Sequence, residues 1–271
     1  MSRTPEPFPP YRARYLPGMT PDQIAGLPDK AWAPVLIATG AIEQHGPHLP
    51  VAVDALMGQV WLGLALDRLP AGASCYVAPP ITIGKSNEHT GFPGTLMISK
   101  GTLRALLLAS ARQIRAWGFR SLAVLNTHGG NTAVVLYTLR EIQSTLGLRA
   151  ELLAPKVDLG ISEQERMYGY HAGEVETSWM LAVVPDRVRQ EKARCEYPAR
   201  IEDPGELRPE QAPAIVSWTA QDLSRSGIMG DATAASAEKG RRWLDLQSRA
   251  YADAIGRLCS EMKNSDAARR S

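Results

Sequence analysis

The chain has 271 residues, of which 44% are hydrophobic and 21% are charged. This length and composition are typical of one large α/β domain or two small ones, and they argue against a disordered chain. The 30 basic and 28 acidic residues leave a net charge of only +2. So small an excess excludes the strong basic field that would attract nucleic acid or an anionic membrane.

The cysteines and the N-terminal residues indicate the cellular location that we expect. Cys75, Cys195 and Cys259 are far apart, and none lies in a CxxC pair. We therefore expect free thiols and a cytoplasmic protein. No apolar run follows the basic residues near the start, and no segment approaches the roughly 20 apolar residues that a membrane span needs. We expect neither a secretory signal nor a membrane helix.

The first predicted elements are an arm, a strand and a helix. Residues 1–30 are expected to form an N-terminal arm whose proline-rich start packs on the body or on a neighbouring subunit. The apolar run over 34–40 ends at a glycine and is typical of a buried strand. A helix is predicted over 54–69, with three apolar residues on one face: Leu56, Val60 and Leu64.

Strands and helices then alternate as far as about residue 155. The helix over 101–117 has the clearest periodicity, with one face that carries Leu103, Leu106, Leu107, Ser110, Ile114 and Trp117. Around it we predict a strand that runs into a loop over 75–84, strands over 121–126 and 150–155, and a further helix over 132–147. Such alternation predicts a mostly parallel sheet with helices on its faces.

The C-terminal part is expected to be more helical. Helices are predicted over 171–184 and 234–262, separated by a polar, proline-rich excursion over 196–215. We place a single hydrolase domain over 31–265 and a basic tail over 266–271. Asp231 is interpreted as a helix cap that leads into the last helix, or as a subunit contact.

The chain has five histidines, and all of them lie in predicted loops that follow strands. In an open α/β sheet, ligands bind outside the carboxyl ends of the strands. In GAIEQHGPHLPVAVD (40–54), Glu43 and His45 project to the same side, and Asp54 returns at the next helix start. These side chains are suitable ligands for Zn²⁺, Mn²⁺ or Fe²⁺. The alternative is a polar loop followed by an aspartate that caps a helix.

The second motif is LNTHGGN (125–131). A buried strand runs into His128, and Gly129 and Gly130 allow close backbone approach or a positive φ. Taken alone, the motif is also compatible with a tight turn or with an anion site at the helix start. Together with the first motif, it supplies a fourth metal ligand.

The third motif, YHAGEVETS (170–178), holds three ionisable groups. If the segment is helical, His171 and Glu174 share a face by their i, i+3 spacing, and Glu176 points elsewhere. A helix start enriched in acidic residues by the helix dipole is the simpler interpretation of the two glutamates.

The fourth motif, GKSNEHTGFPGTL (84–96), is rich in residues that form loops. Its Glu88 and His89 are candidates to line a pocket or to contact the substrate. A structural role for His89, hydrogen-bonded within the loop, is an equal alternative, and the same holds for His48.

Taken in order, these motifs and GDATAASAEKG resemble the creatininase (creatinine amidohydrolase) superfamily from about residue 36 to 240. The resemblance implies a three-layer α/β/α sandwich, one or two divalent ions, of which Zn²⁺ is the first expectation, and a homohexamer. It implies that Glu43, Asp54 and His128 bind one metal and His45 and Asp54 the other, with Glu176 completing the shell. It also places His171 near the scissile bond.

One position departs from creatininase itself. Gly130 stands where creatininase has a glutamate ligand, so the sequence is more similar to the formamide deformylase and mycofactocin peptidase branches. We predict a metal-dependent amidohydrolase that cleaves a non-peptide or cyclic amide C–N bond of a small molecule. Its catalytic residues would be His171, Glu174 and Glu176, and its substrate contacts Glu88, His89, Gly129 and Gly130.

Three alternatives are weighed against this prediction. Within the same superfamily, the chain could be a formamide deformylase or a peptidase. Of another class, it could be a metal-binding scaffold without catalysis. A nucleotide-binding enzyme is disfavoured, because no GxGxxG follows the first strand and no P-loop lysine motif is present.

Overall fold

The computed structural model describes residues 9–70, 72–198 and 217–270. Its central sheet has four parallel strands in the order β2-β1-β3-β4. They are β1 (Val35–Thr39), β2 (Tyr76–Val77), β3 (Ser121–Asn126) and β4 (Arg149–Leu153). The predicted mostly parallel sheet is confirmed, although β2 is much shorter than the strand expected over 75–84. Beyond β2, one isolated bridge from Ile81 to Thr39 continues the pairing.

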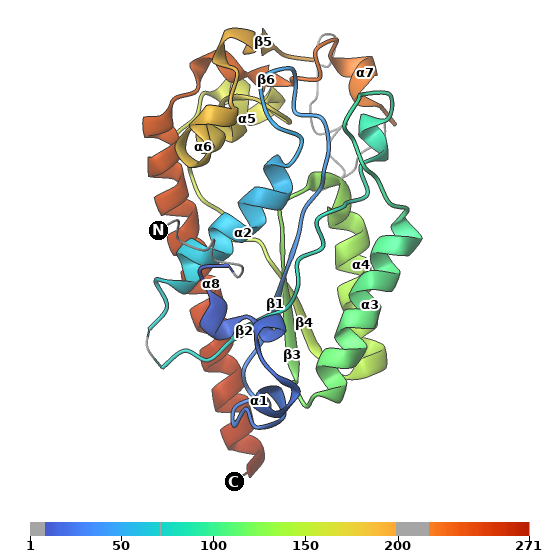
Figure 1. Ribbon diagram of the computed structural model, residues 1–271, viewed down its shortest axis with the longest axis vertical. Coiled ribbons are helices and arrows are strands. Elements are labelled where there is room, and N and C mark those ends of the chain that lie inside the picture. The colour runs from blue at the N-terminus through green and yellow to red at the C-terminus, as the bar shows by residue number, and fades with distance from the viewer. Residues whose placement is uncertain (1–8, 71, 199–216, 271) are drawn as a thin grey trace, which may run out of the picture.

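Helices cover both faces of this sheet and make the predicted three-layer sandwich (Figure 1). One face carries α3 (Lys100–Ala116) and α4 (Thr132–Leu146), and the other carries α2 (Val53–Leu66) and α8 (Ala237–Arg270). Alternate residues of a strand point to opposite faces. In β1, Leu36 therefore packs with α2 and α8, while Ile37 packs with α3 and α4.

Five further elements gather at the end of the molecule toward which the strands run (Figure 1). They are the helices α5 (Glu163–Tyr168), α6 (Glu174–Val183) and α7 (Ala220–Leu223) and the antiparallel pair β5 (Cys195–Glu196) and β6 (Gly230–Asp231). The helix predicted over 171–184 thus begins three residues late, at Glu174. The excursion predicted over 196–215 lies outside the described residues from position 199 onward.

The predicted helices exist, but their most buried residues differ in part from the predicted faces. Of the face predicted for α3, Leu103, Leu107 and Ile114 are buried. Leu106 and Trp117, which directly follows the helix, are instead more than two-fifths exposed. In α2, the predicted Leu56, Val60 and Leu64 are only partly buried. The large apolar residues of α2 that are buried include Val53, Met57, Trp61 and Leu62, because this helix is enclosed between the sheet and α8.

The described part of the N-terminal arm packs on the body. Tyr11 and Leu16 are buried in the two cores, and the Arg14 guanidinium donates to the carbonyl oxygen of Ala73 at 2.9 Å. The short helix α1 (Pro21–Ala25) begins with a capping box between Thr20 and Gln23. The arm, domain and tail boundaries at 30 and 265 stay predictions, although α8 continues through most of the predicted tail. The described ranges contain no helix long and apolar enough to cross a membrane.

Candidate metal centre

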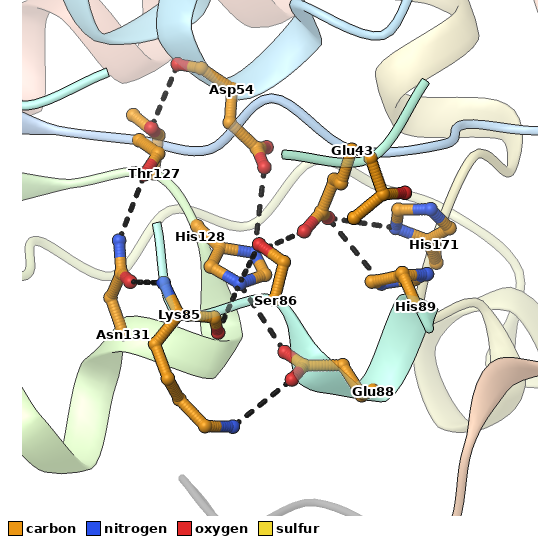
Figure 2. Close-up of polar contacts among 12 residues, drawn as sticks. Glu43, Asp54, Lys85, Ser86, Glu88, His89, Thr127, His128, Asn131 and His171 are labelled. Carbon is orange, nitrogen blue, oxygen red and sulfur yellow. Dashed lines mark hydrogen bonds and ion pairs between the residues drawn. The ribbon is translucent and has the colours of Figure 1, made fainter. Parts of the chain in front are cut away.

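Four separate segments bring their polar side chains together at the carboxyl ends of β1 and β3 (Figure 2). Glu43 and His45 lie in the loop after β1, and Asp54 lies in the first turn of α2. A hydrogen bond from the Glu43 N–H to the carbonyl oxygen of Val51, at 2.8 Å, closes this loop. At its turn, Gly46 has a φ of 69°, which glycine adopts without strain. The loop thereby returns the chain to the centre.

Three overlapping donor sets result, each of them with ligand atoms that lie within 4.8 Å of one another. Set A is Glu43, Asp54 and His128; set B is His45, Asp54 and Glu176; set C is Glu43, His45 and His171. Asp54 belongs to both A and B, and Glu43 to both A and C. One carboxylate shared by two sets is the arrangement that two neighbouring cations would need.

Unpartnered buried atoms show that these residues fit a cation. Among the described residues, Glu43 Oε2, His45 Nε2 and Asp54 Oδ2 are buried polar atoms without a hydrogen-bond partner. A buried polar group normally has a partner, because desolvation without compensation costs about 1–3 kcal/mol. All three atoms face the common centre, where imidazole and carboxylate donors suit Zn²⁺ or Mn²⁺.

The outer nitrogens of two central histidines are held by the main chain. His45 Nδ1 lies 3.1 Å from the carbonyl oxygen of Glu43, and His171 Nε2 lies 2.5 Å from that of Gln44. Each carbonyl fixes the proton on the nitrogen that it contacts. In the neutral ring, the lone pair of the other nitrogen is therefore directed inward, as a ligand or a proton acceptor requires.

The start of α6 decides which glutamate of the third motif joins the centre. His171 precedes the helix and pairs with Met229 in an antiparallel bridge. Glu176 Oε2 lies 3.7 Å from His45 Nε2, whereas Glu174 forms an ion pair with Lys239 on α8. The expectation that His171 and Glu174 share a helix face is wrong, because position 171 is not helical. A catalytic role for Glu174 stays a prediction without support from these contacts.

A strained residue lies between His171 and α6. Ala172 has a φ of 54° and is the one non-glycine residue with a left-handed φ in the described part of the chain. Its N–H donates to Glu176 Oε2 at 2.6 Å. Strain of about 1–3 kcal/mol persists only where the surroundings enforce it, and such residues cluster at functional sites. Here it turns the chain so that the imidazole and the carboxylate both face inward.

The candidates for substrate contact fall in different places. His89 is buried, with Nε2 at 3.4 Å from Glu43 Oε1, and thus lies at the centre (Figure 2). Glu88 contacts the outer side of His128, next to Gly130. A side chain at Gly129 would meet open space. Their role in substrate binding stays a prediction.

Two further predicted residues lie outside the donor sets. His48 Nε2 is 2.8 Å from the Thr177 hydroxyl, which ties the first loop to α6. Asp231 accepts from the N–H of Thr233 at 2.9 Å and so caps a single turn, Ala232–Ala234, rather than the last helix.

Sequence reasoning missed two buried residues that build the site. The Gln44 side chain donates to the carbonyl oxygen of Gly227 and pairs with His89 Nδ1 at 2.9 Å. Glu165 accepts from the N–H groups of Glu174 and Asp231, so that it caps α6 from another segment. Gln44 could have been suspected from its place between Glu43 and His45, but nothing near Glu165 in the sequence indicates its role.

The clustered carboxylates set the protonation of the central histidines. Burial lowers the pKa of His45, but the carboxylates of Glu176, Asp54 and Glu43 outweigh burial and raise it to about 9. In the same way, the pKa of His128 is held well above its usual value. Burial raises the pKa of Glu176 to about 7.

The metal-free protein is expected to lose stability as the pH rises from about 7 to about 9. His45 and His128 have folded-state pKa values above the ordinary 6.5, so they contribute stability that is fully present below pH 6.5 and lost as the pH rises through those pKa values, which for His45 is about 9. Glu176 is about half ionised at pH 7, and its remaining ionisation also lowers stability as the pH rises, because its folded-state pKa of about 7 lies above the ordinary 4.5. His171 has a lowered pKa and is neutral in both states over this range.

Thermal unfolding in the presence of a chelator measures this slope. The variant His45→Gln removes one of the titrating groups and should flatten the decline. A melting temperature that rises between pH 7 and pH 9 in the chelated wild type would contradict the assigned charges.

The chain is similar to known hydrolases. The Creatininase family model, described as creatinine amidohydrolase, matches residues 18–255. The mycofactocin precursor peptide peptidase of Mycolicibacterium smegmatis is 33% identical over 228 residues, which cover 82% of this chain and 84% of that protein. Creatinine amidohydrolase of Pseudomonas putida is 28% identical over 243 residues, which cover 82% of this chain and 88% of that protein.

Solved structures show the same fold. A mutant creatininase of the Zn-Zn type matches with a TM-score of 0.71 at 24% identity, over 89% of this chain and 96% of that one. A structure named Creatininase Mn also gives 0.71, at 22% identity, over 89% of this chain and 97% of that one. The family match and the 33% identity together show that the chain belongs to the creatininase family, whose members hydrolyse amide bonds.

Proposed function

We propose that this hydrolase depends on one or two divalent metal ions to cleave an amide C–N bond. The observation that carries the proposal is the position of Asp54, which is shared by set A and set B. Glu43 and His128 would complete one site, and His45 and Glu176 the other. A bound divalent ion lowers the pKa of a coordinated water toward about 7 and polarises a carbonyl oxygen.

The chain's own residues would move protons near such a water. His171 is neutral at pH 7, because burial and the neighbouring histidines hold its pKa well below the usual value. With Nε2–H directed at Gln44, its Nδ1 can accept a hydrogen bond or a proton. Glu176, with a pKa of about 7, is suited to gain and lose a proton at neutral pH.

Zn²⁺ is the first candidate ion, followed by Mn²⁺ and Fe²⁺. Imidazole nitrogens and carboxylate oxygens suit all three ions. The Zn-Zn and Mn forms of the structural neighbours support Zn²⁺ and Mn²⁺.

A peptide amide is the substrate class that the comparisons favour. The peptidase relative is 33% identical to this chain, against 28% for the creatinine amidohydrolase. The glycine at position 130 also weakens the case for creatinine itself. A small cyclic or non-peptide amide, our prediction from the sequence, stays the second candidate. The homo-oligomeric, hexameric state and the cytoplasmic location also stay predictions.

One experiment tests the proposal as a whole. The purified protein is stripped with a chelator, reloaded separately with Zn²⁺ and with Mn²⁺, and assayed against short peptides, formamides, lactams and cyclic ureides. We expect turnover to vanish on stripping and to return with metal for at least one class. Full turnover by the stripped protein would refute metal dependence. Bound metal without turnover on any substrate would support the scaffold alternative.

A further inference from the structure

Both nitrogens of the His128 ring have close polar contacts. His128 Nδ1 faces the centre, at 3.3 Å from Glu43 Oε2 and 3.4 Å from Asp54 Oδ2. His128 Nε2 points the other way and lies 3.2 Å from Glu88 Oε1 and 3.1 Å from the carbonyl oxygen of Lys85 (Figure 2). The ring therefore lies between the donor sets on one side and a second carboxylate on the other.

Gly130 makes room for this second carboxylate. A Cβ at position 130 would overlap Glu88 Oε1 and would come within 2.5 Å of His128 Nε2 and 2.6 Å of the Lys85 carbonyl oxygen. Contacts below 3.0 Å force a shift, and a main-chain carbonyl cannot move aside cheaply. The space that a side chain at 130 would take is thus occupied by the carboxylate of Glu88.

Glu88 is itself held in place by its neighbours. The Lys85 ammonium group donates to Glu88 Oε2 at 3.0 Å, so the other carboxylate oxygen is left for His128. The Lys85 N–H donates to Asn131 Oδ1 at 2.9 Å, and Asn131 Nδ2 donates to the carbonyl oxygen of Gly40 at 3.0 Å. These bonds fix the 85–88 segment against both β1 and the turn after β3.

A nitrogen that is surrounded by acceptors carries the proton. Lys85 O and an ionised Glu88 carboxylate can only accept hydrogen bonds, and the Ser86 hydroxyl, 3.2 Å from Nε2, can accept as well, so Nε2 of His128 donates. The neutral imidazole then has its lone pair on Nδ1, directed at the centre. A carboxylate behind a ligating histidine fixes the tautomer, orients the ring and raises its basicity.

We propose that Glu88 is a positioning residue, whose carboxylate holds the His128 ring and tautomer so that Nδ1 can bind a divalent ion. This inference rests on the proposed metal dependence of the enzyme. It replaces the substrate contact expected for Glu88 with an action through His128. Gly130 leaves space for the Glu88 carboxylate beside His128. The loop that carries Glu88 and His89 therefore contributes His89 to the centre and also supports His128.

Metal affinity tests the proposal without any assay of turnover. Zn²⁺ is titrated into the stripped full-length protein against a chromophoric chelator, for wild type, Glu88→Gln and Glu88→Ala. Loss of a carboxylate behind a metal-binding histidine typically weakens metal affinity about 10–100-fold. We expect Glu88→Ala to fall in this range and Glu88→Gln, which keeps the volume and one acceptor oxygen, to lie nearer its lower end.

The tautomer of His128 provides a second, spectroscopic measurement. At a pH above the raised pKa of His128, where the ring is neutral, nitrogen-15 shifts of the imidazole in the metal-free protein should report Nε2–H in wild type and a mixture of tautomers in Glu88→Ala. Glu141→Gln is the matched control, because Glu141 also pairs with a cation, Arg104, but lies on the surface of α4. It should leave both the affinity and the tautomer unchanged.

The outcomes separate the two proposals. A wild type that binds no divalent ion overturns the proposed function. A wild type that binds Zn²⁺, together with Glu88 variants of equal affinity and unchanged tautomer, overturns only the positioning role. A raised KM with unchanged metal affinity would instead identify Glu88 as a substrate contact. Glu88→Gln keeps the test valid if the alanine variant fails to fold.

Discussion

Asp54→Ala is expected to abolish both metal binding and turnover. Asp54 belongs to set A and to set B, so its removal leaves each of them one carboxylate short. Its Oδ2 atom is also one of the unpartnered buried atoms at the centre. Loss of an outer partner of a metal ligand alone reduces affinity or activity about 10–100-fold, and loss of a shared ligand should exceed the upper end of that range.

Metal analysis of the purified variant, followed by kcat/KM on the best substrate, measures this effect. His128→Ala removes a ligand from set A only and should retain part of the metal. Asp245→Asn is a suitable control, because Asp245 is a partly exposed aspartate on α8 that pairs with Arg68 and Arg249. If Asp54→Ala keeps full metal content and turnover, the metal centre is wrongly placed.

Gly240→Ala is expected to give a large loss of stability. Gly240 lies on α8 where this helix meets α6, and a Cβ there would overlap the carbonyl oxygen of Ser178 and lie 2.9 Å from Ala182 Cβ. Overpacking costs typically about 1–3 kcal/mol, and a rigid helix backbone puts this contact at the upper end. Alanine recovers only about 1 kcal/mol by its helix propensity. We expect a net loss of about 2 kcal/mol in the free energy of unfolding.

The same helix provides the matched control. A Cβ at Gly256 would find its nearest neighbour, Leu69 Cδ2, at 3.9 Å, an ordinary contact. Gly256→Ala should therefore stabilise the protein by about 0.5–1 kcal/mol. Chemical denaturation of both variants measures the two opposite signs. Equal effects would show that α8 does not approach α6 as closely as described. Because α6 carries Glu176, Gly240→Ala should also weaken metal binding.

The layers of the fold could be predicted from local patterns, and the buried faces of the helices could not. Apolar runs such as 121–126 mark strands because a parallel sheet is covered on both sides. The periodicity of α3 predicts an amphipathic helix, but it assigns Leu106 and Trp117 to the core although both are substantially exposed. Which apolar stripe is buried depends on where α4 and the sheet lie, and one helix in isolation does not contain that information.

The residues of the candidate site could likewise be predicted from the sequence only in part. Glu43, His45, Asp54 and His128 could be proposed from motifs, because each follows a predicted strand or starts a helix at the same edge of the sheet. The choice between Glu174 and Glu176 could not be made. It depends on the residue at which α6 begins, and Glu165 fixes that point by accepting from the Glu174 N–H. A cap supplied by another segment is invisible to spacing rules.

The bridge between His171 and Met229 has a consequence for the order in which the protein matures. A ribosome releases the chain from its N-terminus, so Glu43, Asp54 and His128 emerge before any of α6. Set A can therefore be complete in a nascent chain, while set B must wait for Glu176 and set C for His171. The main chain of residue 171 is in turn paired only after residue 229 has been made. The two halves of the centre are thus assembled at different times, and a chain whose synthesis stops between residues 176 and 229 contains every donor but lacks the main-chain partner of His171.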